Sequence, residues 1–407
     1  MNEKWIETGI KQLEEEFGKE KVDKAIEYVK NFEIELPSWV FGTFGGGRFG
    51  NYTPPAAARN IYEKIDDACF VHKLTGCTPQ IATHILWDFS DDGLEPDYKI
   101  VEKVYQYCKE KGLSFGAISP TYFLTGSHRG SFTSYHKETR KRYIEQTVFG
   151  GEIAKKFGNK FLTLWFPDGS LYPGQIDLKE NYQLMKESLI ESYKKIPEDV
   201  KILIEYKLFE PGTYSTTISD WGTSYILSKS LGENVGVLID LGHHPFGVNI
   251  EKIVAILIAE NMLCGFHFNT RYAADDDQSV QPDLQLARIF YELVKGNVIC
   301  NKDKDKNWAY MIDQACGREN RFHAILNSID SLQISLARAV LTDTEKINYF
   351  QKKDEIILAN REFNKSIALC DVRPVVYKAR LEKGVHFDFI ETYIKTGYQE
   401  KIESQRK

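Results

Sequence analysis

Three carboxylates and one imidazole stand at the carboxyl ends of four successive apolar segments. They are Glu205, Asp240, His267 and Asp313. A charged side chain in such surroundings costs free energy unless it is paired or coordinates a cation. Oxygen and imidazole ligands without thiolates favour Mn²⁺, Mg²⁺ or Co²⁺ over structural zinc. These residues therefore predict a site for one divalent ion.

A second group of ligand-type residues follows the same segments. His243 lies three residues after Asp240, and Asp275 and Asp277 follow His267 in an acidic run. These side chains can hold a second ion beside the first. Each residue alone has a structural alternative, because a strand-end carboxylate can cap a helix, a histidine can be satisfied in the core, and an acidic run is usually a solvated loop. Their combination on successive segments favours metal binding.

Other residues have types that suit work on a ligand. Lys207 lies two residues beyond Glu205, so on a strand both side chains point to the same side, where Lys207 can polarise a bound oxygen or pair with the metal-site carboxylates. His84 has Asp88 four residues later, and a histidine oriented by a carboxylate can move protons, whereas the alternative is a buried histidine bonded to the backbone. Trp165 can stack on a ligand ring or fill the core.

The elements that must position these residues alternate along the chain. Eight segments are short, apolar and rich in β-branched or aromatic residues, which is typical of buried parallel strands. Helical patterns fill the gaps, and another precedes the first segment. The alternation predicts a (β/α)8 TIM barrel, whose catalytic groups gather at the carboxyl ends of the strands. The predicted strands are 38–44, 81–89, 114–120, 161–167, 202–207, 235–243, 263–269 and 308–314.

The same pattern divides the chain into three parts. We expect an N-terminal helical extension at 1–35, the catalytic barrel at 36–340, and a C-terminal helical extension at 341–407 that ends in a solvated polar tail, KIESQRK. The glycine-rich segment GTFGGGRFG matches neither a dinucleotide-binding turn nor a P-loop. A doubly wound nucleotide-binding sheet is therefore disfavoured.

Composition and charge exclude several classes of protein. The 407 residues carry a formal net charge of −6, which lacks the basic footprint of a nucleic-acid binder. The seven cysteines are scattered without a C-x-x-C pair, which argues against a thiolate zinc site and a disulfide framework. The charged N-terminus is not a signal-peptide pattern, and no apolar run has membrane-spanning length. We therefore expect a cytoplasmic protein without nucleic-acid or membrane partners.

The motifs together resemble one known family, the L-rhamnose isomerases related to xylose isomerase. The resemblance runs in order from about Ser38 to beyond Asp313. It implies a homotetrameric (β/α)8 barrel that binds two adjacent divalent ions per subunit, with Mn²⁺ preferred and Co²⁺ or Mg²⁺ as alternatives. The matching segments are GTFGGGRFG, IYEKIDDACFVHKLTGCTPQIATHILWD, IEYKLFEPGTY, IDLGHH, HFNTRYAADDD and YMIDQ.

The resemblance also implies a role for each matching residue. The ligands of one ion would be Glu205, Asp240, His267 and Asp313. The ligands of the catalytic ion would be His243, Asp275, Asp277 and the bridging Asp240. The implied catalytic residues are His84, Lys207 and Asp313. The implied sugar contacts are Trp165, Lys207, His243 and, from the neighbouring subunit's glycine-rich loop, Phe49.

The implied reaction is aldose–ketose isomerisation, with hydrogen moving between C1 and C2 after ring opening assisted by His84. Apolar contacts from Trp165, Phe123 and Phe49 favour a 6-deoxy sugar such as L-rhamnose, with weaker activity on L-mannose, L-lyxose or D-allose. Three alternatives are open. They are a ketose 3-epimerase, disfavoured because no second glutamate stands opposite Glu205, a metal-dependent hydrolase, and a sugar-binding module without catalysis.

Overall fold

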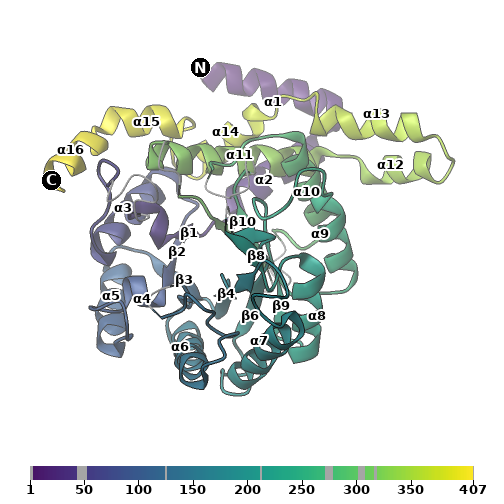
Figure 1. Cartoon of the computed structure of the whole chain (residues 1–407). Coiled ribbons are helices and arrows are strands. Elements are labelled where there is room, and N and C mark those ends of the chain that lie inside the picture. Colours follow the sequence, from purple (N-terminus) through teal and green to yellow (C-terminus); the bar gives the residue numbers. More distant parts are fainter. Residues whose placement is uncertain are drawn as a thin grey trace.

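Eight parallel strands form one sheet that curls into a barrel with helices around it (Figure 1). This computed structural model describes residues 3–43, 53–123, 126–210, 213–270, 278–300, 308–315 and 319–406. Because the strands run parallel, their carboxyl ends share one rim. In sheet order they are β1 (Leu36–Pro37), β2 (Gln80–His84), β3 (Ser114–Ser119), β4 (Phe161–Leu164), β6 (Lys201–Glu205), β9 (Val235–Asp240), β10 (Cys264–Phe268) and β11 (Trp308–Ile312).

The first strand joins the last through the backbone of Glu35. Its N–H donates to the Tyr310 carbonyl at 2.9 Å, and its own carbonyl accepts from Ile312 at 3.1 Å. The Glu35 side chain crosses Gly116, where a Cβ would overlap the carboxylate, so a larger residue at 116 would force the Glu35 side chain to move. The eight-stranded parallel sheet confirms the predicted barrel fold.

The barrel interior is a packed core, and the candidate site continues it toward the rim. One interior layer consists of Ala117, Phe161, Leu203, Leu238, Leu263 and Ala309. Side chains two positions apart on a strand share a face. Glu205 therefore stands above Leu203, and Asp240 above Leu238, on the inward side of the barrel.

The predicted first strand, 38–44, is wrong. The strand is only Leu36–Pro37, and Ser38–Phe41 form a 3₁₀ helix, η1. Tertiary bonds hold this turn, because the Ser38 hydroxyl donates to Asp88 and the Trp39 indole N–H donates to Asp313. An apolar run without alternation fits a strand or a short helix equally well, so the pattern alone could not decide.

Most of the helices around the barrel begin at a side-chain cap. Seven of the eight start after an Asp or Asn whose side chain accepts from a backbone N–H of the first turn. A short helix, α4 (Ile85–Asp88), also follows β2 directly, so the predicted strand 81–89 is correct only as far as His84. The eight are α3 (Ile61–Thr75), α5 (Tyr98–Glu110), α6 (Lys137–Lys156), α7 (Leu178–Tyr193), α8 (Trp221–Leu231), α9 (Ile250–Ala259), α10 (Leu284–Lys295) and α11 (Arg321–Leu341).

A small antiparallel sheet forms from the segments that follow β4 and β6. Its order is β5 (Gly169–Ser170), β8 (Tyr214–Thr216) and β7 (Phe209–Glu210). The backbone N–H of Thr217 donates to the Asp168 carbonyl at 2.7 Å, which ties this sheet to the end of β4. The sheet therefore brings the loop after Glu205 over the barrel rim.

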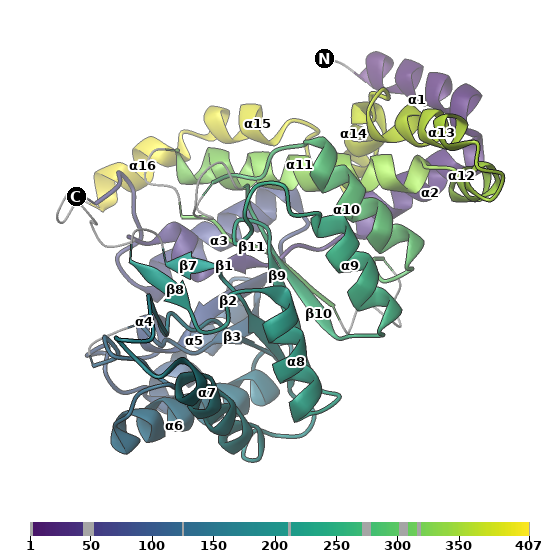
Figure 2. The ribbon, with the colours of Figure 1, turned by 45° about the vertical axis from the view of Figure 1, so that its right-hand side comes forward.

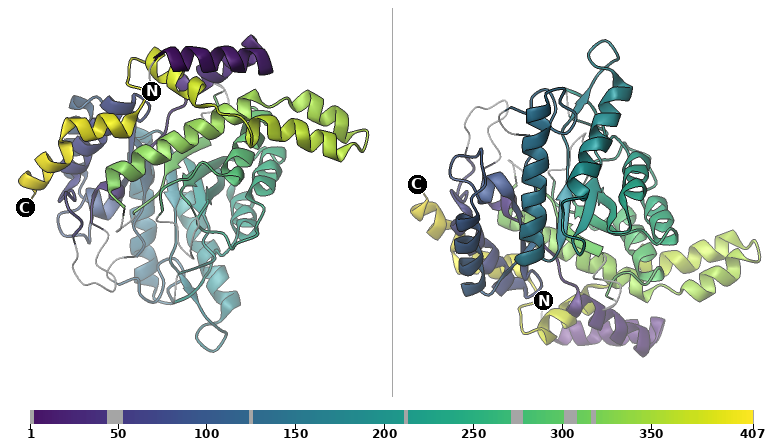
Figure 3. Two further views of the ribbon diagram at one scale, coloured as in Figure 1. Left: turned by 90° about the horizontal axis from the view of Figure 1, so that it is seen from above. Right: turned by 90° about the horizontal axis from the view of Figure 1, so that it is seen from below.

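Helices from both ends of the chain pack together outside the barrel (Figures 2 and 3). The predicted N-terminal helix is two helices, α1 (Glu3–Phe17) and α2 (Lys19–Asn31), separated by Gly18 with φ 87°. Helix α2 packs against α11 and α14 (Arg373–Glu382). Helices α12 (Thr344–Gln351) and α13 (Ile356–Ile367) form a hairpin that projects from the body (Figure 1).

The expectation of a solvated tail is wrong at Arg406. Helices α15 (Phe389–Thr396) and α16 (Tyr398–Gln405) fold back toward α3. Arg406 Nη1 lies 2.7 Å from Asp67 Oδ2, and the Tyr398 hydroxyl donates to Asp67 Oδ1 at 2.8 Å. The Asp67 side chain is fully buried and needs these partners.

Among the described residues, no helix has the length and apolarity needed to span a membrane.

Candidate metal centre

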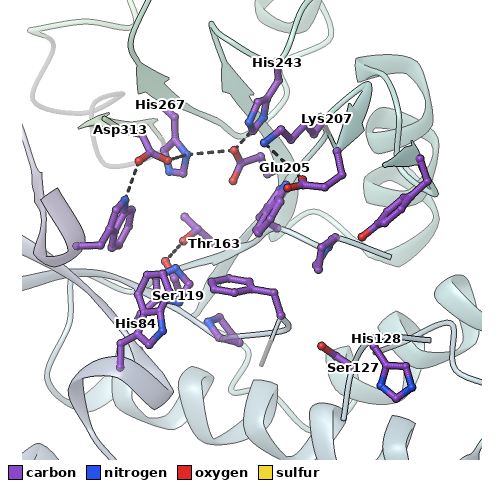
Figure 4. Close-up of a pocket in the computed structure, with 18 of the residues that line it drawn as sticks. His84, Ser119, Ser127, His128, Thr163, Glu205, Lys207, His243, His267 and Asp313 are labelled. Atoms are coloured by element: carbon purple, nitrogen blue, oxygen red, sulfur yellow. Dashed lines mark hydrogen bonds and ion pairs between the residues drawn. The ribbon is translucent and has the colours of Figure 1, made fainter. Parts of the chain in front are cut away.

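The four predicted ligands of the first ion meet on adjacent strands at the rim, and Figure 4 labels three of them, Glu205, His267 and Asp313. His267 Nδ1 lies 3.1 Å from Asp313 Oδ2 and 3.2 Å from Glu205 Oε1. It lies 3.7 Å from Asp240 Oδ2. Each of the four residues offers one ligand atom, and these atoms lie within 4.8 Å of one another. Side chains from four strands thus converge on one point.

Burial makes this cluster dependent on positive charge. Glu205 is 4% exposed, Asp240 0% and His267 3%. Burial raises the pKa of Glu205, but the charge of His267 and hydrogen bonds from His243 and His267 bring that pKa down to about 2. Burial lowers the pKa of His267, but the carboxylates of Glu205 and Asp313 raise it well above its usual value. Three carboxylates and one imidazole around this point fit a divalent cation.

Neighbouring groups hold the carboxylates in place. Asp240 Oδ1 accepts from the backbone N–H of Gly242 at 2.7 Å and from Asn269 Nδ2 at 3.0 Å. The Trp39 indole N–H donates to Asp313 Oδ1 at 2.7 Å. Such outer partners orient metal ligands and raise affinity. Trp39 was missed by sequence reasoning because it lies in the segment predicted as a strand.

His243 presents one ring nitrogen to the backbone. Its Nδ1 lies 2.9 Å from the Tyr206 carbonyl, which can only accept, so Nδ1 carries a proton. His243 lines the same pocket as the cluster, with Nδ1 3.2 Å from Glu205 Oε1. The adjacent His244 is bonded through Nε2 to the Tyr206 hydroxyl at 2.7 Å. The Nε2 edge of His243 is therefore the edge suited to a second ion.

Three predicted site residues lie outside the described residues. Asp275 and Asp277, the other expected ligands of the second ion, fall in 271–277. Phe49, the expected contact to a neighbouring subunit, falls in 44–52. The second ion and the intersubunit contact therefore stay predictions.

A pocket of about 660 Å³ opens beside the cluster, a size suited to a small molecule. Aromatic rings form one wall, with Phe123 5.3 Å from Trp165 and 5.0 Å from Trp87 between centroids. The predicted residues that line it are His84, Trp165, Glu205, Lys207, His243, His267 and Asp313. An acidic, imidazole-rich end and an aromatic wall thus share one cavity.

A profile of the xylose isomerase-like TIM barrel family matches residues 78–286. The chain belongs to the xylose isomerase-like TIM barrel family. Two curated relatives extend the likeness over nearly the whole chain. A probable sugar isomerase of Mesorhizobium japonicum is 33% identical over 93% of this chain and 87% of that protein. A probable sugar isomerase of Rhizobium meliloti is 33% identical over 95% of this chain and 89% of that protein.

Solved structures share the family barrel at low identity. An L-ribulose 3-epimerase covers 80% of this chain and 98% of its own, with 11% identity and a TM-score of 0.51. A D-tagatose 3-epimerase-like protein covers 76% of this chain and 98% of its own, with 12% identity and a TM-score of 0.50. At such identity these structures bear on the fold alone.

In this family member, Lys207 faces the pocket beside a residue that the sequence did not single out. Its Nζ lies 3.6 Å from Glu210 Oε2 and 5.3 Å from the centre of the Trp165 ring. Among the described residues, Lys207 therefore pairs with Glu210 rather than with Glu205 or Asp240. The spacing Lys207-x-x-Glu210 was the available signal, but only the small sheet brings the two side chains together.

His84 is not oriented by Asp88, which corrects that expectation. Asp88 accepts from the His84 backbone N–H at 2.8 Å and from Lys64 Nζ at 2.6 Å. The imidazole Nδ1 instead lies 3.1 Å from Thr121 Oγ1. Asp88 is the last residue of α4, which follows the strand directly. Its carboxylate therefore lies one helical turn after His84 and accepts from the His84 backbone N–H rather than from the ring. Burial lowers the pKa of His84 to about 3.

Proposed function

We propose that the chain is a metal-dependent aldose–ketose isomerase that converts L-rhamnose to L-rhamnulose. The observation that carries the proposal is the buried cluster of Glu205, Asp240, His267 and Asp313 at one end of an aromatic-walled pocket. The names of the two curated relatives, both probable sugar isomerases, support the reaction class.

The cluster would hold one divalent ion, with Mn²⁺ preferred and Co²⁺ or Mg²⁺ as alternatives. His243, Asp275 and Asp277 would hold a second ion, and Asp240 would be a ligand of both ions. When bound, divalent ions would supply Lewis-acid polarisation of the sugar carbonyl, which favours hydrogen transfer between C1 and C2. Trp39 and Asn269 keep the ligands in position for this role.

The chain's own residues would bind and orient the open sugar. Lys207 is held between Glu210 and the Trp165 ring, so its ammonium group can donate to a sugar oxygen (Figure 4). Asp313 is fixed by Trp39 at the opposite side. His84 lies on the wall next to Trp87, with 4.6 Å between ring centroids. These groups would surround the sugar from three directions.

The aromatic wall supports a 6-deoxy substrate. Trp87, Phe123 and Trp165 line the part of the pocket that would meet carbons four to six. A methyl group can be buried against such rings, and one added hydroxyl costs about 1–3 kcal/mol, or roughly 10–200-fold in kcat/KM. We therefore expect weaker activity on L-mannose, L-lyxose and D-allose.

The carboxylate arrangement argues against a ketose 3-epimerase. Such an enzyme needs a second acid–base glutamate opposite Glu205. In the described part of the pocket, the carboxylates besides Glu205 are Asp313, which lies 3.1 Å from His267 Nδ1, and Glu210, which is paired with Lys207. We further propose a cytoplasmic homotetramer in which the partner's Phe49 completes each pocket, and light scattering at assay concentration tests the assembly.

Kinetics over a matched panel test the reaction. The purified protein is incubated with L-rhamnose, L-mannose, L-lyxose, D-allose, D-xylose and D-glucose, and with ketoses such as D-tagatose. Each incubation is repeated with EDTA, and products are separated by chromatography. We expect the highest kcat/KM for L-rhamnose. A higher value for D-xylose or D-glucose would contradict the substrate, and 3-epimerisation of the ketoses alone would contradict the reaction.

A further inference from the structure

The hydroxyl of Thr121 is the side-chain partner of the His84 ring. Thr121 follows β3 and is fully buried. Its backbone is clamped by Gln146, which accepts from the Thr121 N–H and donates to the Thr121 carbonyl at 3.2 Å. The hydroxyl therefore stands at a fixed place between two elements, 3.1 Å from His84 Nδ1 and 3.2 Å from the Leu86 N–H.

Counting protons at this hydroxyl fixes the tautomer of His84. A threonine hydroxyl has one proton to donate and lone pairs to accept with. The Leu86 N–H can only donate, so it occupies a lone pair of Thr121 Oγ1. The buried hydroxyl proton needs an acceptor. Of the two partners that the described residues give Thr121 Oγ1, only His84 Nδ1 can accept it. Nδ1 is therefore unprotonated, and the proton of the neutral ring is on Nε2.

The surroundings keep the ring neutral. Burial and the charge of Lys64 lower the pKa of His84, although Asp88 and Glu205 act in the opposite direction and His267 acts with Lys64. On its other sides the ring meets Trp39 at 4.9 Å and Trp87 at 4.6 Å between centroids. His84 lines the pocket, so the Nε2 edge is the one left for a ligand.

We infer that Thr121 fixes His84 as the Nε2–H tautomer, so that His84 donates a hydrogen bond to a sugar oxygen and takes no proton from it. The inference rests on the proposed function for the nature of the ligand. Thr121 acts here as a positioning residue. His84 thus differs from the expected proton carrier. The nitrogen remote from the sugar is a hydrogen-bond acceptor, and in the described part of the chain Thr121, not a carboxylate, is the side chain bonded to the ring.

Nitrogen NMR tests the tautomer without any activity assay. The Mg²⁺-loaded protein is labelled with [¹⁵N]histidine, and the His84 signals are identified by their loss in His84→Gln. We expect an unprotonated Nδ1 and a protonated Nε2 across neutral pH. A protonated Nδ1, in either the neutral or the charged ring, would overturn the inference.

Variants connect the tautomer to turnover. Thr121→Ser keeps the hydroxyl and should retain both the tautomer and most of the activity. Thr121→Val should lower kcat/KM about fivefold, since a hydrogen bond of this kind contributes on the order of 1 kcal/mol. Thr342→Val is the matched control, because it removes a buried hydroxyl contact to Ser366, outside the pocket lining. Equal losses in Thr121→Ser and Thr121→Val would contradict positioning by the hydroxyl.

Substitution of His84 itself separates donation from proton transfer. His84→Gln offers an N–H near the position of Nε2 but cannot titrate, so we expect it to retain more activity than His84→Ala. Equal activity of these two variants would overturn the donor role. If the wild-type protein shows the Nε2–H tautomer but turns over no sugar, the catalytic role and the proposed function both fail, whereas an active isomerase with protonated Nδ1 overturns only this inference.

Discussion

The indole N–H of Trp39 donates to Asp313 Oδ1 at 2.7 Å, which ties η1 after the first strand to the end of the last. The other oxygen, Oδ2, lies 3.1 Å from His267 Nδ1 within the cluster. The carboxylate of Asp313 is thus divided, with one oxygen anchored by the indole and one turned toward the predicted ion. The hydrogen bond also crosses the seam at which the barrel closes.

Trp39→Phe keeps an aromatic ring in the wall but removes the N–H that anchors Asp313. We expect the substitution to weaken binding of the first ion about tenfold, at the lower end of the effect that such outer partners have on metal affinity. Titration calorimetry of the metal-stripped protein with Mn²⁺ measures the change.

Trp165→Phe is the matched control for this change. It also removes an indole N–H from the pocket, but Trp165 Nε1 has no hydrogen-bond partner among the described residues. Its Mn²⁺ affinity should equal that of the wild type. Equal weakening in both variants would show that the Trp39–Asp313 bond does not orient a ligand.

Removal of divalent ions should abolish activity and lower the melting temperature. An ion that binds only the folded state stabilises it by mass action, by about 2.7 kcal/mol at a hundredfold excess over Kd. Thermal unfolding with EDTA and with added Mn²⁺ measures this, and Asp240→Ala should lose most of the response. Full activity in protein shown by elemental analysis to be metal-free would contradict the site.

Sequence patterns were sufficient to predict most strands of the barrel and the four residues of the cluster. Seven of the eight strands are continuous apolar runs bounded by polar turns, and the strand-end rule then placed Glu205, Asp240, His267 and Asp313 on one rim. The first strand failed because Ser38 and Trp39 are held by bonds to Asp88 and Asp313, distant partners that no local pattern reveals.

The residues that support the site were harder to predict. Thr121 and Glu210 contact His84 and Lys207, and neither has an unusual sequence context. The tail was misjudged for a similar reason. Arg406 looks like a solvated charge until α16 brings it to the buried Asp67. Such contacts depend on tertiary placement, which charge and periodicity do not encode.

Lys207→Met should reduce catalysis without releasing the ion. It removes the ammonium that faces the pocket but leaves the four clustered ligands intact. Loss of one charge-stabilising donor costs roughly 10²-fold in kcat. Glu210→Gln, which loosens Lys207, should cause a smaller loss. Steady-state kinetics with L-rhamnose, together with Mn²⁺ titration, measure both, and an unchanged kcat would exclude Lys207 from the chemistry.

Arg406→Ala should destabilise the fold strongly. The guanidinium makes two bonds to Asp67, whose side chain is fully buried, and its loss leaves an unpaired charge. Breaking a buried pair costs about 3–5 kcal/mol. Arg373→Ala removes an exposed pair with Asp371 and should cost less than about 1 kcal/mol. Urea unfolding of both variants makes the comparison, and equal costs would contradict the importance of the Arg406–Asp67 contact.

Glu35→Gln should change how stability depends on pH. Burial raises the pKa of Glu35 from 4.5 to about 7, although the Ala117 N–H and Asn159 oppose the shift. Because the folded pKa lies above the unfolded value, this stabilising contribution is complete below pH about 4.5 and is lost as pH rises through about 7. Glutamine cannot ionise, so Glu35→Gln should match the wild type near pH about 4 and exceed it near pH about 8, by up to about 3 kcal/mol. Urea midpoints at the two pH values measure the difference. The same pH dependence in both proteins would mean that Glu35 does not titrate in this range.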